Sequence, residues 1–418
     1  MSVPATPTNI LQNVITYNRI NIALLLNQYC MLNIANTQFN DFEQSNPANL
    51  GDTISFEKQY RFTSKASLVA SYQGTQQRVQ TLTVDRPISI GLAYTAEQLI
   101  FNVDRYRTTI GNNAAAEIGA KVEYDLTGVF EEFPYRFYGD GVTPINSFGE
   151  LGKAWALFDD FGSAAYDRKA VLPTTVVPSI VNTGLNQFVP IRNDDMAKSW
   201  EIGEWNNCKW YTSNLLHTHY SGTVGSARAT LTVVSTVQDP LTGGVIAMTL
   251  SGCPSPNDPN AIKKYDRFVF NDTSTSQLRF LTFTGHVPCS NPVQFKAVAD
   301  AVSDAGSQVT VFIDPPLQAA SGRDQNITAS IVPGMTVTVL PSHKVSGIFS
   351  GNQVYVAMPR LPNMDPYKTG TETAPGTGVG LRMYTGGLFG ENQYATVIDG
   401  IWGRTAVPEN MMALIHPL

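Results

Sequence analysis

The chain has 418 residues, which is enough for two or three folding units with sizeable cores. Charged residues make up only 15% of it, below the roughly 25% of typical soluble domains, and the net charge is −6. An acidic balance argues against a protein whose task is to grip nucleic acid. A surface poor in ions favours burial against other subunits, because amides and hydroxyls cost less to desolvate than ions do.

The N-terminal residues and the cysteines indicate the compartment. Residues 1–9 have neither a basic region nor an apolar core, and no apolar run reaches the roughly 18 residues of a membrane span. The four cysteines lie far apart and form no CxxC pair, so we expect reduced thiols rather than disulfides or a zinc ribbon. We therefore expect a soluble protein made in a cytoplasm. The cysteines are Cys30, Cys208, Cys253 and Cys289.

The run from Ile10 to Ile34 predicts a helical N-terminal arm. Asn9 is placed to cap it, and apolar side chains recur among Asn, Gln and Tyr. These apolar residues are too many for a solvated helix, so they must be buried. Burial on a neighbouring subunit and packing in the core of the same subunit both stay open.

Two alternating segments follow and predict a long β-hairpin. The apolar residues from Ile54 to Phe62 share one parity, and those from Leu82 to Leu92 share another. The connection, residues 63–77, is polar and contains glycine. We therefore expect a mobile tip that reaches outward.

The longest predicted helix follows the hairpin. The sequence TAEQ at 95–98 fits a capping box, and Asp104 is placed to cap a second helix. Apolar residues then recur at three- or four-residue spacing until Phe133-Pro134 ends the helix. A core helix of any α/β protein would show the same pattern. The stripe consists of Ile110, Ala114, Ile118, Val122, Leu126 and Val129.

The remainder of the chain changes character twice. A short helix is predicted over residues 148–158, and helix or loop near 194–205. Between Thr223 and Leu340, short β-branched runs separated by turn residues predict a compact antiparallel barrel or sandwich. A Gly-, Thr- and Pro-rich loop at 363–380 and a closing β segment at 394–418 follow. The six runs are 229–234, 245–250, 267–270, 293–298, 309–313 and 335–339.

The best candidate for metal chemistry is His217-Thr218-His219. On a strand it would place two imidazoles on one face, with Cys208 as a further ligand. Two ligands do not make a site, so ordinary surface or core histidines are the favoured interpretation. We predict no metal and no cofactor.

Other motifs give no catalytic site. Glu131 and Glu132 are adjacent rather than facing, which indicates a solvated helix end rather than an acid–base pair. The glycines at 376–380 precede a strand, whereas a phosphate-cradling loop requires a helix. We predict that the protein is not an enzyme.

Three blocks of sequence carry a family resemblance. VDRPISIGL at 84–92, followed by TAEQL at 95–99, is similar to the junction between strand and spine helix in the coat proteins of short-tailed enterobacterial phages. His343-Lys344 with VYVAMPRLP at 354–362 is similar to a second block of that family, and IDGIWG at 398–403 with Pro408-Glu409 to its closing signature. The chain thus resembles the major capsid proteins of tailed bacteriophages with the Hong Kong 97 fold, and most closely the Salmonella podovirus type.

The resemblance implies an α+β fold with an N-terminal arm, an extended hairpin, a long spine helix, a central domain and an inserted all-β barrel domain. The corresponding segments are 1–48 for the arm, 49–92 for the hairpin and 93–222 for the spine helix with the first part of the peripheral and central domain. Segment 223–341 would be the inserted barrel, and 342–418 the closing part.

The resemblance also implies a function. The chain would be a major capsid protein that self-assembles into the icosahedral shell of a double-stranded DNA phage, in the virion, after synthesis in the bacterial host cytoplasm. Its partners would be further copies of itself in hexamers and pentamers, a scaffolding protein, a portal protein and packaged DNA in non-specific contact, with no membrane. The alternative is a phage tail or receptor-binding structural β protein, which suits the Thr- and Val-rich middle but not the long helices.

The distribution of charge suggests where subunits touch. Basic residues gather on the predicted hairpin and acidic residues near the long helix, so the hairpin of one subunit could lie over the acidic helix of its neighbour. Solvated charges on a two-stranded ribbon are the alternative. The loop at 238–244, with Asp239, would correspond to a shorter form of the family loop that contacts neighbouring capsomers. The candidate contact residues are Lys58, Arg61, Lys65, Arg78, Arg86, Glu123, Asp125, Glu131, Glu132 and Asp239; Asp140 lies near the acidic group.

Overall fold

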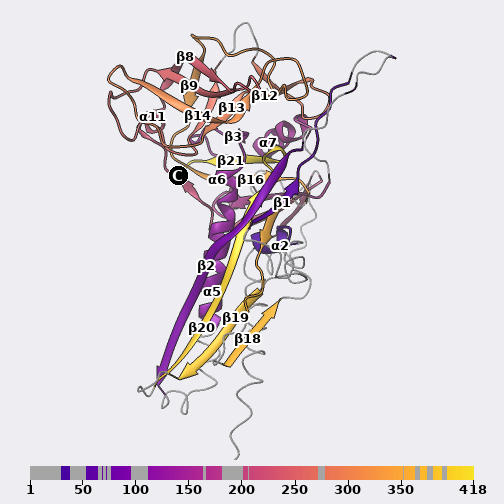
Figure 1. Ribbon diagram of the computed structural model, residues 1–418, viewed down its shortest axis with the longest axis vertical. Coiled ribbons are helices and arrows are strands. Elements are labelled where there is room, and N and C mark those ends of the chain that lie inside the picture. The colour runs from indigo at the N-terminus through magenta and orange to yellow at the C-terminus, as the bar shows by residue number, and fades with distance from the viewer. Residues whose placement is uncertain are drawn as a thin grey trace, which may run out of the picture. The chain divides into compact units, whose positions relative to one another are not determined.

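The computed structural model describes residues 30–37, 53–64, 68, 72, 77–95, 112–162, 166–180, 201–205, 207–271, 278–351, 353–362, 368–373, 380–387 and 393–418. The chain divides into two compact units (Figure 1). The first takes in parts of 1–56, 79–126 and 352–406, and the second parts of 57–78, 127–351 and 407–418. The predictions for residues 1–29, for Lys65, for the capping box and for the glycine loop at 376–379 lie outside the described residues.

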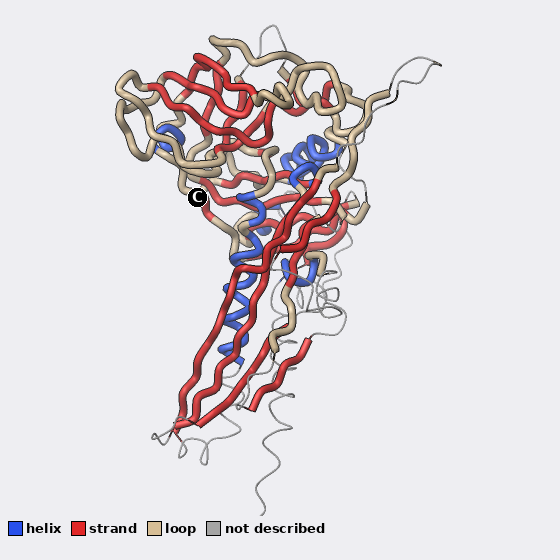
Figure 2. The backbone as a smooth tube through the Cα atoms, in the orientation of Figure 1, coloured by secondary structure: helices blue, strands red, loops and turns tan. Residues whose placement is uncertain are grey.

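The first unit is built on a six-stranded sheet. Its order is β1 (Thr53–Glu57), β2 (Val79–Thr95), β20 (Gln393–Ala406), β19 (Gly380–Gly387) and β18 (Lys368–Thr373), with β17 (Val354–Ala357) also paired to β20. Figure 2 shows β2 and β20 as two long neighbouring strands. The strand β2 forms where the alternation predicted it, whereas β1 ends at Glu57, so the predicted continuation of the first strand to Phe62 is wrong. The ribbon is not two-stranded, however, because β20 covers the other edge of β2.

Two described helices belong to the first unit, α2 (Cys30–Ile34) and α5 (Asn112–Thr127), whose last residue begins the second unit. The predicted apolar stripe is buried throughout the described part of α5, at Ala114, Ile118, Val122 and Leu126. The predicted helix does not run unbroken to Phe133. Gly128 separates α5 from the short α6 (Val129–Glu132) of the second unit.

The second unit contains a seven-stranded sheet. Its order is β3 (Phe137–Tyr138), β21 (Met411–His416), β16 (His343–Phe349), β4 (Arg168–Pro173), β6 (Cys208–Ser213) and β5 (Glu201–Trp205), with β7 (Thr218–His219) paired to β16. The helices α7 (Phe148–Asp160) and α8 (Val177–Ile180) accompany it, and η3 (Pro408–Asn410) precedes β21. Residues 201–205 form a strand because they pair with β6, so the prediction of helix or loop there is wrong.

The predicted short helix at 148–158 is α7. Ser147 caps its N-terminus by accepting the backbone N–H of Glu150 at 3.2 Å. Its apolar face, with Leu151, Ala154 and Phe158, is buried against residues of β4, β6, β16 and β21. The apolar spacing therefore predicted both the helix and the face that it buries.

A closed barrel of six antiparallel strands completes the second unit, as predicted. The six β-branched runs are its six strands: β8 (Thr230–Gln238), β9 (Val245–Ser251), β10 (Arg267–Phe270), β13 (Gln294–Ala297), β14 (Gln308–Leu317) and β15 (Thr336–Val339). Phe268 and Phe295 stack in its core, with ring centroids 4.7 Å apart. The helix α11 (Thr223–Ser226) and the two-stranded sheet of β11 (Arg279–Leu281) and β12 (Pro288–Pro292) lie outside the barrel order.

The barrel is connected to the seven-stranded sheet at one place. The chain leaves the sheet at β7 and returns to it at β16, and these two strands are hydrogen-bonded neighbours with His219 opposite His343. All six barrel strands lie between them in the sequence. The chain therefore enters and leaves the barrel at two strands that lie side by side.

Candidate functional site

Asp125, near the end of α5, is the centre of an ionic cluster in the first unit. Arg86 of β2 forms an ion pair with one carboxylate oxygen. Trp402 of β20 donates its Nε1–H to the other oxygen at 2.9 Å, and Arg404 Nε lies 3.5 Å from that oxygen. The structure thus joins a basic residue of the predicted hairpin to an acidic residue of the predicted helix within one chain.

Glu123, also on α5, is buried. Its carboxylate is only 1% exposed and accepts hydrogen bonds from the Cys30 thiol at 3.2 Å and the backbone N–H of Met31 at 2.9 Å. Burial and the adjacent carboxylate raise the pKa of the Cys30 thiol well above its ordinary value, so the thiol remains a donor. Glu123 was predicted as a candidate contact between subunits, but in the structure its carboxylate is buried and bound inside its own unit.

The hairpin loop, defined here as residues 58–78, belongs to the second unit and is tied to Glu409 of η3. Arg78 Nη2 lies 2.5 Å from Glu409 Oε1, and Lys58 Nζ lies 3.7 Å from Oε2. Burial by itself would raise the pKa of Glu409, but Lys58 and Arg78 outweigh it and lower the pKa below its ordinary value. Arg61 lies over the ring of Phe283, 4.6 Å from the centroid. Three predicted cations of the hairpin therefore already have contacts in their own chain.

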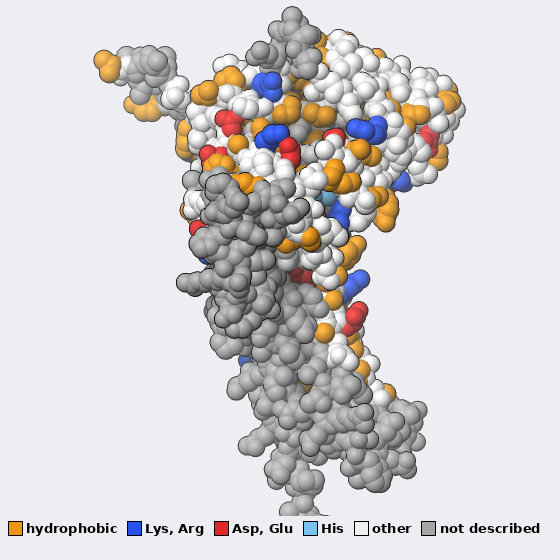
Figure 3. Space-filling model, turned by 180° about the vertical axis from the view of Figure 1, so that it is seen from behind, with side chains coloured by type: hydrophobic (Ala, Val, Ile, Leu, Met, Phe, Trp, Pro, Cys, Tyr) orange, Lys and Arg blue, Asp and Glu red, His pale blue; other side chains and the backbone are white. Residues whose placement is uncertain are grey.

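The same hairpin loop exposes large apolar side chains. Leu68 and Tyr72 are fully exposed, and Phe62 and the adjoining Val79 of β2 are about half exposed. On the face drawn in Figure 3, the charged side chains in the upper part of the view are scattered among polar and apolar ones. Residues 63–77 were predicted to be a polar connection, but Leu68, Val69 and Tyr72 in the sequence already indicated an apolar part within it.

Glu131 of α6 joins both histidines of the His-Thr-His motif. His217 Nδ1 lies 3.1 Å from Glu131 Oε2, and His219 Nδ1 lies 2.9 Å from Oε1. His219 Nε2 lies 2.8 Å from Asp266 Oδ1, and the ring of His343 is 5.2 Å from that of His219. Burial would raise the pKa of Glu131, but the hydrogen bonds from the two histidines lower it to about 2. Glu131 is therefore not the solvated helix end that its sequence indicated.

The histidine motif does not form a recognisable metal centre. Among the described residues, no group of three or more His, Cys, Asp and Glu side chains is arranged to hold a metal ion. Cys208 lies on β6, where burial raises the pKa of its thiol to about 12. Within the described part of the chain, no helix is long and apolar enough to cross a membrane.

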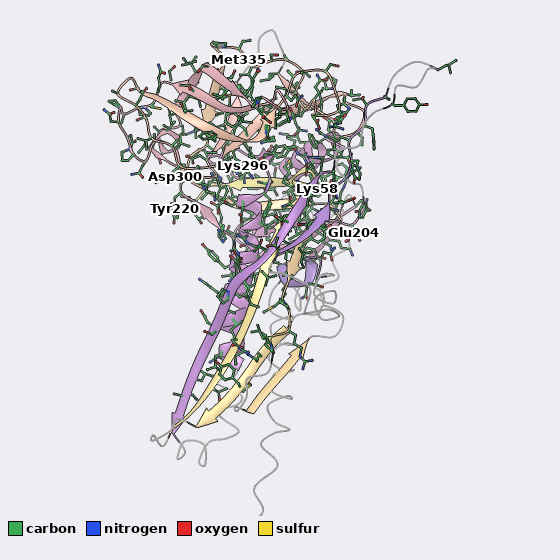
Figure 4. The ribbon with its side chains drawn as sticks, viewed as in Figure 1. Lys58, Glu204, Tyr220, Lys296, Asp300 and Met335 are labelled. Carbon is green, nitrogen blue, oxygen red and sulfur yellow. The ribbon has the colours of Figure 1, made fainter. Side chains whose placement is uncertain are left out.

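The barrel contacts the segment 130–137 through buried polar side chains. Arg267 of β10 donates to the backbone carbonyls of residues 130, 131 and 134 at 2.8 to 3.1 Å. Lys296 of β13 donates to the backbone carbonyls of residues 132 and 133. The side-chain amide of Gln294 accepts the backbone N–H of Phe137 and donates to its carbonyl, both at 2.9 Å. Lys296 lies on the opposite side of the barrel from Met335 (Figure 4). Cations at the last carbonyls of α6 are favourable, because helices end in partial negative charge.

The last two members of the predicted contact set differ in exposure. Glu132 is half-buried at the end of α6. Asp239 is exposed in the turn between β8 and β9, where its carboxylate accepts the hydroxyl of Thr242 at 2.7 Å and the backbone N–H of Leu241 at 3.1 Å. Leu241 beside it is almost fully exposed. Asp239 is thus free to meet a partner without losing a contact outside its own turn.

Comparison with known proteins gives distant structural likenesses only. No family model matches the chain, and no curated protein matches it. Its structure is similar to one of Mycobacterium phage Che8, with 7% identity over 93% of this chain and 91% of that one and a TM-score of 0.45. It is also similar to the capsid of cyanophage P-SCSP1u (8% identity, 88% and 84% covered, TM-score 0.42) and to a virus-like particle from Pyrococcus furiosus (6%, 96% and 97%, TM-score 0.40). Scores and identities this low carry no conclusion about the present chain.

Proposed function

We propose that this chain is the major capsid protein of a tailed, double-stranded DNA bacteriophage, a Hong Kong 97-type shell subunit of the podovirus type with an inserted barrel domain. One observation carries the proposal. The main segments of the three sequence blocks that resemble the coat-protein family, far apart in the chain, are hydrogen-bonded neighbours in one sheet. They form parts of β2, β17 and β20, whereas His343-Lys344 lies on β16 and Pro408-Glu409 in η3.

The three blocks meet most closely at Gly403 of β20. Val84 of β2 is its register partner on one side, and Ala357 of β17 on the other. A Cβ atom at this position would lie 2.1 Å from the backbone oxygen of Thr83, so only glycine fits there. The glycine that ends the IDGIWG block therefore has a physical reason, which supports treating the block as more than a chance match.

Side chains of the same blocks also converge on one residue. Arg86 of the first block and Trp402 of the third both contact Asp125 of the long helix. A charge-assisted cluster of this kind fixes two strands to the helix beside them. It supports the arrangement of strand, spine helix and closing strand that the resemblance implies.

The exposed hairpin loop supports self-association. Burying a leucine or aromatic side chain contributes about 1.5–3 kcal/mol to the free energy of association. Leu68 and Tyr72 are fully exposed in the isolated chain, so burying them against another subunit would stabilise the assembly. In a shell, each such contact is repeated by symmetry. The proposed partners are further copies of the chain in hexamers and pentamers, a scaffolding protein, a portal protein and packaged DNA in non-specific contact, in a particle assembled in the host cytoplasm.

We also propose charged contacts between subunits, with a smaller contribution to assembly. Asp239 remains a candidate for such a contact, since it is exposed and its hydrogen bonds are local. Lys58, Arg78 and Arg86 already form ion pairs within their own chain. Any pairing of these three with a neighbour would compete with those contacts, so we give apolar burial of the hairpin loop the larger role.

The test is negative-stain electron microscopy of the purified protein, expressed alone and together with a candidate scaffolding protein. We expect closed shells, or spirals of a repeating ring unit. The double variant Leu68→Ser, Tyr72→Ser should stay folded but form few or no shells. The matched control Val142→Ser, Tyr166→Ser, at two other exposed positions, should assemble normally. Discrete trimers or monomers of the unaltered protein under both conditions would favour the tail-protein alternative instead.

A further inference from the structure

His219 lies where the chain leaves the seven-stranded sheet to enter the barrel. It is the last residue of β7, next to the returning strand β16, and is nearly fully buried. Its two ring nitrogens face different parts of the second unit. Nδ1 lies 2.9 Å from Glu131 on α6, and Nε2 lies 2.8 Å from Asp266, which immediately precedes barrel strand β10. The imidazole therefore bridges the barrel to the helix beneath its connection.

The hydrogen-bond inventory decides how many protons the ring carries. The second carboxylate oxygen of Asp266 accepts the backbone N–H groups of Gly222 at 3.1 Å and Lys263 at 2.7 Å. This oxygen therefore acts only as an acceptor. Glu131 accepts His217 on its second oxygen at 3.1 Å. A neutral imidazole has one N–H and could serve only one of the two carboxylates. Both contacts are satisfied together when His219 is an imidazolium.

The remaining charged and titratable groups around the ring do not replace that proton. His343 on β16 donates Nδ1–H to the carbonyl of Pro341 at 2.6 Å, and burial lowers its pKa to about 3, so it is neutral. Arg267 of β10 uses its guanidinium on backbone carbonyls. The ammonium of Lys263 turns to Asn260 and Asp300, at 2.6 and 3.5 Å.

From this geometry we propose that His219 is a protonation-controlled latch between the inserted barrel and the α6 segment. With both nitrogens protonated, the ring holds Asp266 and Glu131 together. When one proton leaves, a lone pair faces a carboxylate oxygen, so that contact becomes repulsive and the connection at residues 217–222 and 341–345 loosens. This inference goes beyond the proposed function, since it concerns the isolated subunit.

The direction of the pH dependence follows from the surroundings. Burial by itself would lower the pKa of His219, but the hydrogen bonds from Asp266 and Glu131 outweigh it and raise the pKa above its ordinary value. The latch is therefore fully engaged below the pKa of an unfolded histidine. It is lost as the pH rises through the raised pKa of the folded state.

The test is hydrogen–deuterium exchange of the full-length, unassembled subunit in EDTA between pH 6 and 9, corrected for intrinsic exchange. Protection at 217–222 and 341–345 is measured relative to α7. We expect it to fall with pH, by about tenfold for each unit by which folding raises the pKa of His219. His219→Gln should show low protection with no such pH dependence. Two controls, His217→Gln and His286→Gln in the connection between β11 and β12, should keep the fall.

Two results would overturn the latch. One is a relative protection that does not change with pH in the unaltered protein. The other is a fall that persists in His219→Gln, which would assign it to another group such as Lys296, whose pKa burial lowers. If His219→Gln does not fold, an NMR titration of the His219 ring in the unaltered subunit decides, because a pKa below the ordinary histidine value contradicts the proposal. Neither measurement depends on whether shells form.

Discussion

The barrel and the hairpin loop belong to the same unit but use their side chains in opposite ways. The barrel turns most of its large apolar residues inward, as with the stacked Phe268 and Phe295, and buries Arg267 against backbone carbonyls, although Phe312 of β14 is 56% exposed. The hairpin loop turns Leu68 and Tyr72 outward, and both are fully exposed. The barrel thus has a core of its own, whereas Leu68 and Tyr72 leave apolar surface open to another molecule.

This contrast explains how the barrel can stay in place while another segment of the same unit remains available for contact. The barrel joins the sheet through two adjacent strands, and polar side chains of β10 and β13 hold it to residues 130–137. The hairpin loop is held near its base by the carboxylates of Glu409 and Glu57, and the ion pairs to Glu409 are the more buried of these contacts.

Removing the charged anchor of the barrel should have the largest effect. Arg267→Met leaves three backbone carbonyls of the 130–134 segment without their charged donor, so we expect a loss of about 3–5 kcal/mol in the free energy of unfolding. Urea denaturation of the unassembled subunit measures it. The control Arg279→Met removes a more exposed arginine of the barrel region, which donates to one carbonyl, and should cost at most about 1 kcal/mol. Equal losses for the two variants would show that the carbonyl contacts of Arg267 are unimportant.

Weakening the base of the hairpin loop should have a smaller effect. Glu409→Gln leaves Lys58 and Arg78 without an anionic partner, and we expect a loss of about 1–3 kcal/mol. Because these cations lower the pKa of Glu409, its contribution is present at neutral pH and is lost as the pH falls through that lowered pKa. Denaturation midpoints at several pH values measure both effects. The control Glu204→Gln removes an exposed carboxylate of β5, away from the hairpin loop in the sequence, and should change neither the stability nor its pH dependence. A similar change in this variant would point to general charge effects.

The parts of the fold that sequence predicted are those set by local pattern. The six β-branched runs became the six barrel strands, and the apolar spacing gave α7 and the buried stripe of α5, because alternation and helical periodicity act over a few residues. The pairing of β2 with β20 was not predicted. It joins residues about three hundred positions apart, and no local pattern specifies the partner of a strand.

The candidate site was predicted less well, for the same reason. The motif at 217–219 was recognised, but its carboxylate partner Glu131 lies 86 and 88 positions away. Glu123 looked like a surface charge because its burial depends on Cys30 and Met31 of a distant helix. Charge along a sequence indicates where ions are, whereas their exposure depends on tertiary packing.

The smallest effect on the fold is expected at Asp239, on the exposed turn of the barrel. Its hydrogen bonds reach only Leu241 and Thr242, so Asp239→Ala should leave the thermal midpoint of the subunit unchanged. If the turn contacts a neighbouring subunit, as we propose, the same variant should lower the yield of closed particles in co-expression with the scaffold. Asp304→Ala, in another turn of the barrel domain with equally local hydrogen bonds, is the matched control. A normal yield for Asp239→Ala would restrict contacts between subunits to the hairpin loop, and the barrel would then be a domain that is complete within its own chain.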